Sequence, residues 1–220
     1  MEAENPTYAE TLRRKPMTQR SDLLQRGPSP AERRLVLLHG WGADADDLLD
    51  LGPMLVGPEV SVVALRAPEP HPYGPGRQWY GLQPIDWEQL PAARLSLQQR
   101  LEELGQSVPL PQTVLLGFSQ GGAMAIDVGS GLPLAGIVAC SGYPHEGWQP
   151  PVAMPPVLLS HGREDPVVPF GASAQLQQLL QGAGGEPQLL AFSGGHTIDA
   201  SVLTPISQFI RGRLAAAPQG

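Results

Sequence analysis

Lysine and cysteine are almost absent from this chain. Lys15 is the single lysine, which leaves a P-loop or a Schiff-base enzyme without a plausible lysine. Cys140 is the single cysteine, which excludes an intramolecular disulfide and a multi-cysteine zinc or iron–sulfur site. No apolar run approaches about 18–20 residues, and charges and prolines occupy the first thirty residues, where a signal peptide would be apolar. We therefore expect a cytoplasmic protein without stable membrane insertion.

Positive charge is also scarce. The chain has 14 Lys and Arg against 21 Asp and Glu, a net charge of −7. This balance lacks the basic patch that a nucleic-acid backbone requires, so we expect no nucleic acid among the partners. No histidines, cysteines or carboxylates recur at the spacing of metal ligands, so we expect no metal and no other cofactor. The expected partner is a small-molecule substrate, bound by a monomer or a homodimer.

Six short apolar runs without alternation are typical of strands buried in a parallel sheet: 35–38, 60–65, 113–116, 134–139, 156–159 and 188–192. Apolar stripes with helical spacing lie between or after them, at 90–104, 172–180 and 198–210. The alternation predicts an α/β fold with a mainly parallel central sheet and helices on both faces. Ligands of such sheets bind beyond the carboxyl ends of the strands.

The change of texture along the chain predicts one folded domain. We assign residues 31–214 to this domain. Residues 1–30 are polar and end in prolines, so we expect a weakly ordered N-terminal arm with room for one short strand or helix. Residues 215–220 are expected to form a flexible C-terminal tail.

A G-x-S-x-G motif at 117–121 follows one predicted strand and precedes a helical pattern. In a sharp strand-to-helix turn, only glycine fits two places before and after the serine, whose hydroxyl is then exposed as a nucleophile. A chain this rich in glycine also produces the motif by chance, and the alternative is an ordinary strand-to-helix turn. The nucleophile hypothesis requires a carboxylate and a histidine later in the chain, in that order.

Both partners are present after Ser119 in that order. Asp165 lies in the loop after the fifth predicted strand, and His196 lies in the loop after the sixth. The sequence therefore predicts a catalytic triad of Ser119, Asp165 and His196. Glu164 is the alternative acid, but adjacent side chains in an extended loop point apart, and Asp-Pro favours a turn, so we prefer Asp165.

An oxyanion hole needs two backbone N–H donors, and we assign these to Gln120 and to Trp41 in the loop 39–42. The alternative is a flexible glycine turn in which Trp41 only packs. Five other residues receive structural interpretations in place of catalytic ones: hydrogen-bonded residues at strand ends (His39, His161), exposed loop residues (His71, His145) and a buried or site-lining thiol (Cys140).

Four ordered motifs together resemble the phospholipase/carboxylesterase family of α/β-hydrolases, which includes the acyl-protein thioesterases: Leu38–Gly42, Gly117–Gly122, His161–Pro169 and Gly194–His196. The resemblance implies an α/β-hydrolase fold and a serine esterase or thioesterase acting without a cofactor. Carboxylic esters, lysophospholipids and acyl-cysteine are the implied substrates. The resemblance also places an aromatic pair, here Trp79 and Tyr80, beside the catalytic serine.

The long proline-rich loop 66–89 carries Trp79 and Tyr80, and its length favours a binding role. The alternative is a hydrophobic cluster that fixes the loop. We also assign Val167, in the acid loop, to substrate binding. Residues 141–155 leave no room for a large lid, so we expect an open site.

From these features we predict a serine esterase for short to medium acyl chains. An acyl-protein thioesterase or lysophospholipase is the first alternative, and a small peptidase or perhydrolase shares the same triad. A non-enzymatic ligand-binding protein on the same fold is the last alternative.

Overall fold

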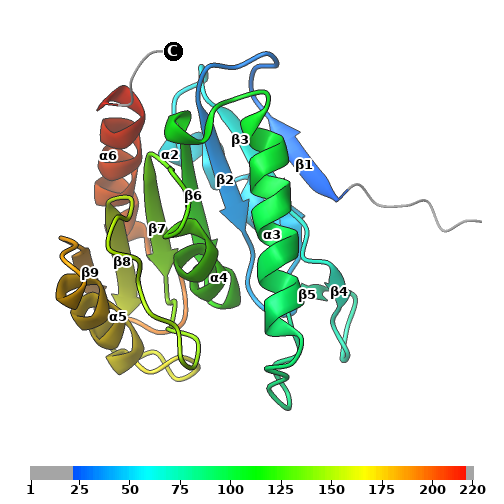
Figure 1. Ribbon diagram of the computed structural model, residues 1–220, viewed down its shortest axis with the longest axis vertical. Helices are drawn as coiled ribbons and strands as arrows, with labels where there is room; N and C mark the ends of the chain where they lie inside the picture. The colour runs from blue at the N-terminus through cyan, green and yellow to red at the C-terminus, as the bar shows by residue number, and fades with distance from the viewer. Residues whose placement is uncertain (1–21, 217–220) are drawn as a thin grey trace, which may run out of the picture.

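A seven-stranded sheet is the centre of the protein, whose residues 22–216 are described by a computed structural model (Figure 1). The strand order is β1-β3-β2-β6-β7-β8-β9, with β1 antiparallel to β3 and the other neighbours parallel. The strands are β1 (Leu23–Arg26), β2 (Arg34–Leu38), β3 (Ser61–Leu65), β6 (Thr113–Phe118), β7 (Gly136–Cys140), β8 (Val157–Gly162) and β9 (Gln188–Phe192). All six predicted strands are present, and the predicted mainly parallel sheet is confirmed.

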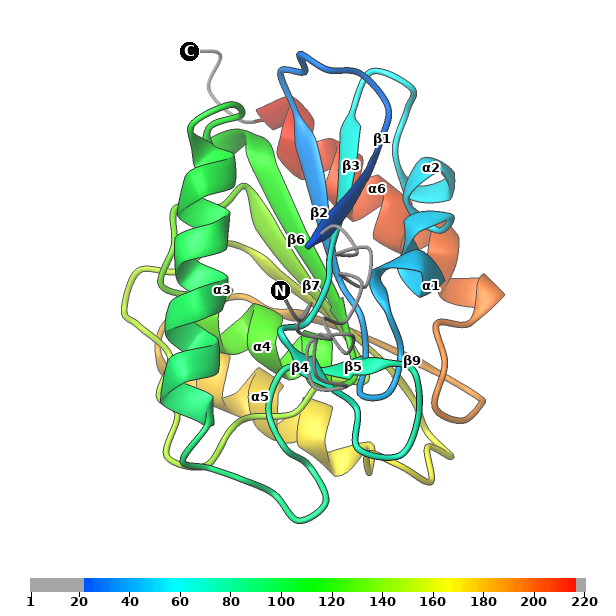
Figure 2. The same cartoon turned by 90° about the vertical axis from the view of Figure 1, so that its right-hand side faces the viewer.

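Helices cover both faces of this sheet, as predicted (Figure 2). One face carries α3 (Leu90–Gly105), α4 (Gln120–Gly129) and α5 (Gly171–Gly182), and the other carries α1 (Ala45–Leu49), α2 (Gly52–Leu55) and α6 (Ala200–Ala216). A 3₁₀ turn (Leu110–Gln112) precedes β6. Beyond the end of β2, a small hairpin pairs β4 (Glu69–Pro70) with β5 (Arg77–Gln78).

Burial explains why these segments adopt their structures. Every residue of β2, β3, β7 and β8 is buried, because helices cover both sides of the parallel sheet. In α6, Val202, Ile206, Ile210 and Leu214 recur every four residues and form the buried stripe. Fully burying a side chain of this size contributes about 1.5–3 kcal/mol, so the apolar stripes decide which helix face packs on the sheet.

The sheet gains an edge strand from the segment that we assigned to the N-terminal arm. Leu23 pairs with Leu65 and Arg26 with Val62, so β1 continues the sheet beside β3. Residues 1–21 of the arm, and residues 217–220 of the expected tail, lie outside the described residues. Residues 22–30 are described and carry β1, the one short element for which the sequence left room.

Two glycines in helices have opposite packing environments. A Cβ atom on Gly121 of α4 would lie 2.2 Å from the carbonyl oxygen of Leu38, whereas a Cβ on the exposed Gly212 of α6 would have no neighbour within 4 Å.

We therefore predict opposite effects of alanine at these positions. Gly212→Ala should raise the free energy of unfolding by about 0.8–1 kcal/mol, because alanine is the better helix former. Gly121→Ala should lower it by about 1–3 kcal/mol, because the strand and helix must separate. Urea unfolding of both variants measures the difference, and equal stability of the two variants would contradict the close approach of α4 to β2.

Candidate active site

Ser119 occupies the turn between β6 and α4 in a strained backbone conformation. Its φ of 54° and ψ of −118° lie in a region that residues with a side chain rarely adopt. The turn is held on both sides, because the Ser119 N–H donates to the carbonyl of Cys140 at 2.8 Å and its own carbonyl accepts from Ala123 at 3.0 Å. The serine therefore sits at the carboxyl edge of the sheet, at the N-terminus of a helix.

Close backbone packing around this turn requires glycine. A Cβ atom on Gly117 would lie 2.0 Å from the carbonyl oxygen of Gly121, so a larger residue at 117 would push the strand away from the helix. A Cβ on Gly40 would lie 3.4 Å from the Cβ of Ser119. The loop after β2 therefore packs directly on the serine.

The structure brings Ser119, His196 and Asp165 into one hydrogen-bonded row. His196 Nε2 lies 2.9 Å from Ser119 Oγ, and His196 Nδ1 lies 2.7 Å from Asp165 Oδ2. A carboxylate can only accept, so Nδ1 carries the proton of the neutral imidazole and Nε2 accepts the serine hydroxyl. The three side chains come from three separate loops at the carboxyl ends of β6, β8 and β9.

The Asp165 carboxylate is surrounded by donors. Its Oδ1 accepts from the backbone N–H groups of Val167 at 2.8 Å and Val168 at 2.9 Å, and its Oδ2 lies 3.2 Å from His161 Nε2. Burial alone would raise the pKa of Asp165, but the hydrogen bonds from His196, Val168 and Val167 outweigh it and hold the pKa below its usual value. The carboxylate therefore stays ionised beside His196.

Glu164, the alternative acid, has a different partner. Its carboxylate accepts from the backbone N–H of Gly194 at 2.5 Å, and its own N–H donates to the Gly194 carbonyl at 3.0 Å. Glu164 therefore fastens the loop after β8 to the loop that carries His196, while Asp165 contacts the imidazole.

The backbone N–H groups of Trp41 and Gln120 are free of hydrogen bonds to other protein atoms in residues 22–216. Gln120 is the first residue of α4, where N–H groups have no partner inside the helix. Trp41 follows Gly40, which packs on Ser119. Both predicted oxyanion donors are thus unpaired and close in the structure to the serine.

Trp79 and Tyr80 do not line the cavity beside Ser119, so the binding role that we assigned to them is not what their positions show; they fit the alternative of a hydrophobic cluster that fixes the loop. They are 1% and 0% exposed and belong to the core between the sheet and α3. The Gln120 side chain explains this placement, because its amide accepts from the Trp79 N–H at 3.0 Å and donates to the Tyr80 carbonyl at 2.8 Å. The Trp79 indole donates to the His39 carbonyl at 2.9 Å. These hydrogen bonds join the loop before α3 to α4 and to the loop after β2. The partners of Trp79 and Tyr80 are therefore distant in sequence.

A cavity of about 420 Å³ opens beside Ser119 and His196. Its other lining residues are almost entirely apolar or aromatic: Trp41, Leu82, Ile85, Tyr143, Val167, Val168, Pro169 and Ala172. Val167 and Trp41 are therefore on the wall, and Leu82 and Ile85 take the place that we assigned to the aromatic pair. Their apolar character within a proline-rich loop was the available signal in the sequence.

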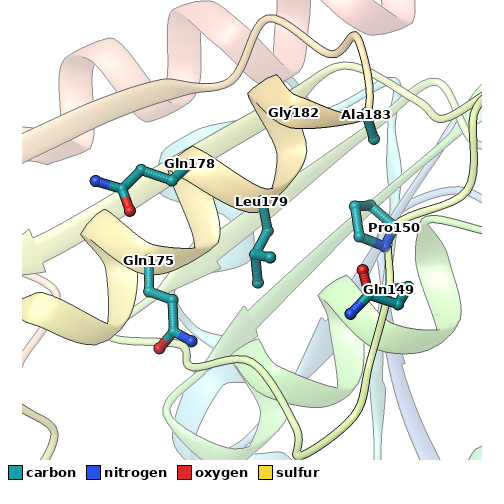
Figure 3. A pocket seen from close by; sticks show the side chains of 7 residues that line it. All are labelled: Gln149, Pro150, Gln175, Gln178, Leu179, Gly182 and Ala183. Carbon is teal, nitrogen blue, oxygen red and sulfur yellow. The ribbon is translucent and has the colours of Figure 1, made fainter.

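A second hollow of about 480 Å³ lies between α5 and the segment before β8 (Figure 3). Gln149, Gln175 and Gln178 line it together with Pro150, Leu179, Gly182 and Ala183. None of these side chains titrates, so this hollow offers amide hydrogen bonds but no acid, base or nucleophile. Chemistry, and not volume, distinguishes the cavity at Ser119.

The remaining candidate residues have structural environments. His39 and His161 are buried and hydrogen-bonded: His39 accepts from Ala67 N–H at 3.0 Å, and His161 Nδ1 lies 2.7 Å from Ser173 Oγ. Burial raises the pKa of the Cys140 thiol to about 12, which keeps it protonated. His71, which we expected to be exposed, is half-buried, because its ring packs against Trp41 with 4.3 Å between the ring centroids.

His145 is a correction. We expected an exposed loop residue, but His145 is only 3% exposed. Its imidazole contacts Asp127 and Tyr80. These two partners lie on α4 and in the loop before α3, so the local proline-rich sequence did not reveal them.

Within the described part of the chain, no helix is both long and apolar enough to cross a membrane. Residues 22–216 also contain no group of three or more His, Cys, Asp or Glu side chains arranged to hold a metal ion.

The lowered pKa of Asp165 predicts a pH-dependent contribution to stability. A carboxyl group with a folded pKa below its unfolded value of about 3.9 stabilises the fold fully above that value, and the contribution is lost as the pH falls through the folded pKa. The stability difference between the wild type and Asp165→Asn should therefore be largest near neutral pH and shrink below about pH 4. Urea unfolding at a series of pH values measures it, and a constant difference would contradict the low pKa.

Known proteins share this architecture. Residues 22–214 match the model of the Phospholipase/Carboxylesterase family. Esterase YpfH of Escherichia coli is 27% identical over 188 residues, which cover 80% of this chain and 81% of the relative. Acyl-protein thioesterase 1 of Neurospora crassa is 31% identical over 124 residues, 51% of each chain.

The crystal structure of esterase PE8 superposes with a TM-score of 0.78 at 32% identity, and the match covers 87% of this chain and 98% of that one. The structure of YahD with malic acid has a TM-score of 0.75 at 20% identity and supports the fold alone. With its α/β-hydrolase fold and a family match over nearly all of the described residues, the chain belongs to the phospholipase/carboxylesterase family of hydrolases.

Proposed function

We propose that this protein is a serine esterase that cleaves carboxylic esters of short to medium acyl chains through an acyl-enzyme on Ser119. The observation that carries the proposal is the continuous row Ser119–His196–Asp165 at the edge of an apolar cavity. Relatives named esterases, YpfH and PE8, support ester hydrolysis as the reaction.

In the first half of the reaction, Ser119 Oγ attacks the ester carbonyl while His196 Nε2 takes its proton. The Asp165 carboxylate stabilises the imidazolium through Nδ1–H. The negative oxygen of the tetrahedral intermediate accepts from the N–H groups of Gln120 and Trp41. His196 then gives its proton to the departing alcohol, and the acyl group remains on Ser119.

Water completes the cycle by the same path. His196 removes a proton from a water molecule, the hydroxide adds to the acyl-enzyme carbonyl, and the same N–H groups hold the oxyanion. Collapse releases the carboxylic acid and returns the proton to Ser119. No metal or organic cofactor takes part in these steps.

The cavity supports a preference for short to medium acyl chains. Its volume of about 420 Å³ is near the lower end of the roughly 300–1,000 Å³ of ligand pockets. Ile85 and Val167 on its wall are 49% and 65% exposed, so the outer part of the site is in contact with water. Each methylene that is buried contributes about 0.8 kcal/mol, and this gain ends where the wall ends.

The cytoplasmic location and the monomeric or homodimeric state stay predictions.

Loss of the nucleophile should abolish the reaction without unfolding the protein. We predict that Ser119→Ala removes p-nitrophenyl butyrate hydrolysis and labelling by a fluorophosphonate probe, because the remaining groups act only together with the serine. Thermal melting of the variant checks the fold. Turnover near that of the wild type would end the proposal.

The adjacent carboxylates give a matched control for the same row. Asp165→Asn should lower kcat by about 10³–10⁴, because the amide no longer holds the required histidine tautomer. Glu164→Gln should change kcat much less, because Glu164 contacts the Gly194 backbone. The reverse ranking would transfer the acid role to Glu164.

The selectivity for acyl length should depend on the apolar wall. We predict that Ile85→Ala lowers the ratio of kcat/KM for hexanoate over acetate esters by about two- to fivefold, since it removes apolar contact area from the cavity. Met54→Ala, an exposed change on α2, should leave this ratio unaltered. If kcat/KM of the wild type rises steadily to long acyl chains, lysophospholipase or depalmitoylating activity becomes the better assignment.

A further inference from the structure

Tyr143 has the one hydroxyl among the described residues that line the cavity, apart from that of Ser119. Trp41 is the other lining residue with a polar side-chain atom, but its indole N–H donates to Gln78 Oε1 at 2.8 Å. A polar substituent of a substrate bound beside the reacting ester therefore has Tyr143 as its available side-chain partner.

The Tyr143 hydroxyl is the end of a buried chain of hydrogen bonds. Its oxygen lies 2.6 Å from the Tyr80 hydroxyl, which lies 3.0 Å from His145 Nε2. His145 Nδ1 lies 2.5 Å from Asp127 Oδ2 on α4. Tyr80 is fully buried, so its hydroxyl, which the Gln120 side chain also approaches, has no access to bulk water.

The charge at Asp127 determines the direction of every proton in the chain. Asp127 Oδ2 accepts from Arg94 and lies against His145 Nδ1, so in the tautomer that fits this contact the ring proton is on Nδ1 and Nε2 is an acceptor. Tyr80 must then donate its single proton to His145 Nε2. The Tyr80 oxygen is left to accept, so Tyr143 donates its own proton to Tyr80. The Tyr143 oxygen keeps a free lone pair and has no proton to offer.

Arg94 and the burial of the two tyrosines support this direction of the hydrogen bonds. Arg94 donates to Asp127 Oδ2 from Nε at 2.8 Å and from Nη2 at 2.5 Å, so this oxygen acts as an acceptor toward both of its partners. Burial raises the pKa of Tyr143 to about 12, against a smaller lowering by the hydrogen bond with Tyr80. Burial, with the neighbouring Tyr143, also raises the pKa of Tyr80 far above its usual value. Both hydroxyls therefore keep their protons in the working pH range.

We propose that Tyr143 is a specificity-determining residue that presents a hydrogen-bond acceptor to the substrate, and that the enzyme favours esters with a hydroxyl or N–H donor near the scissile bond. The proposal rests on the esterase function proposed above. A donor that enters an apolar cavity needs a partner there, whereas a group that can only accept finds none at Tyr143. Net hydrogen-bond strengths of this kind correspond to about a two- to tenfold preference.

Matched ester pairs test the proposal on both sides of the scissile bond. The acyl pair is p-nitrophenyl 3-hydroxybutyrate and 3-methoxybutyrate, and the alcohol pair is 2-hydroxyethyl and 2-methoxyethyl butyrate. Comparing the hydroxy-to-methoxy ratio of kcat/KM between wild type and Tyr143→Phe cancels the size of the methyl group. We expect the wild-type ratio to exceed that of Tyr143→Phe by about two- to tenfold in at least one pair.

Tyr73→Phe is the matched control, because Tyr73 is an exposed tyrosine outside the cavity lining and its substitution should keep the wild-type ratio.

Tyr80→Phe tests whether Tyr80 sets the direction of the Tyr143 hydrogen bond or only supports the Tyr143 ring. Without Tyr80 as acceptor, the Tyr143 proton can turn to the substrate, so kcat/KM should rise for the methoxy ester relative to the hydroxy ester. A purely structural role would lower both together.

Binding to the Ser119→Ala variant, measured by calorimetry, keeps the test independent of turnover. The hydroxy ester should bind about two- to tenfold more tightly, relative to its methoxy partner, than in Ser119→Ala/Tyr143→Phe. Equal ratios with and without the Tyr143 hydroxyl in both pairs would overturn the inference, even if the wild type is a proficient esterase. If no ester is hydrolysed, the proposed function fails, while the binding ratio still decides the role of Tyr143.

Discussion

The contact between main-chain atoms at the start of α4 is the constraint on which the site depends. Gly117, Gly121 and Gly40 have no side chain, so β6, α4 and the loop after β2 approach within distances that a Cβ atom would prevent. This packing fixes the backbone strain at Ser119 and places the N–H groups of Trp41 and Gln120 near its side chain. The histidine and the carboxylate only need loops of the right length to reach a serine whose position is already determined.

The parallel sheet and the row of reactive side chains could be predicted from the sequence for the same reason. Strands buried on both faces are continuous apolar runs, so each was visible alone, and the loops after them had to meet at one edge of the sheet. Asp165 and His196 were therefore assigned from their place after β8 and β9. The preference for Asp165 over Glu164 as the neighbour of His196 agrees with the observed contacts.

Features that depend on partners far apart in the chain were not predictable in this way. Trp79 and Tyr80 have a local sequence typical of an exposed proline-rich loop, and their burial follows from the amide of Gln120, some forty residues later. His145 is buried because Asp127 and Tyr80 meet it from two other segments. The edge strand β1 lacks the apolar run of an interior strand, since half of it faces water.

The Gln120 amide is hydrogen-bonded to the main chain of Trp79 and Tyr80, so it holds the loop before α3 by contacts that do not depend on the side chains after Tyr80. The segment from Leu82 to Glu88 is therefore a cassette between two fixed points, the Gln120 anchor and the start of α3. Substitutions in this segment would leave the hydrogen bonds among Ser119, His196 and Asp165 in place. For protein engineering, this cassette is the natural place to build libraries for new substrates.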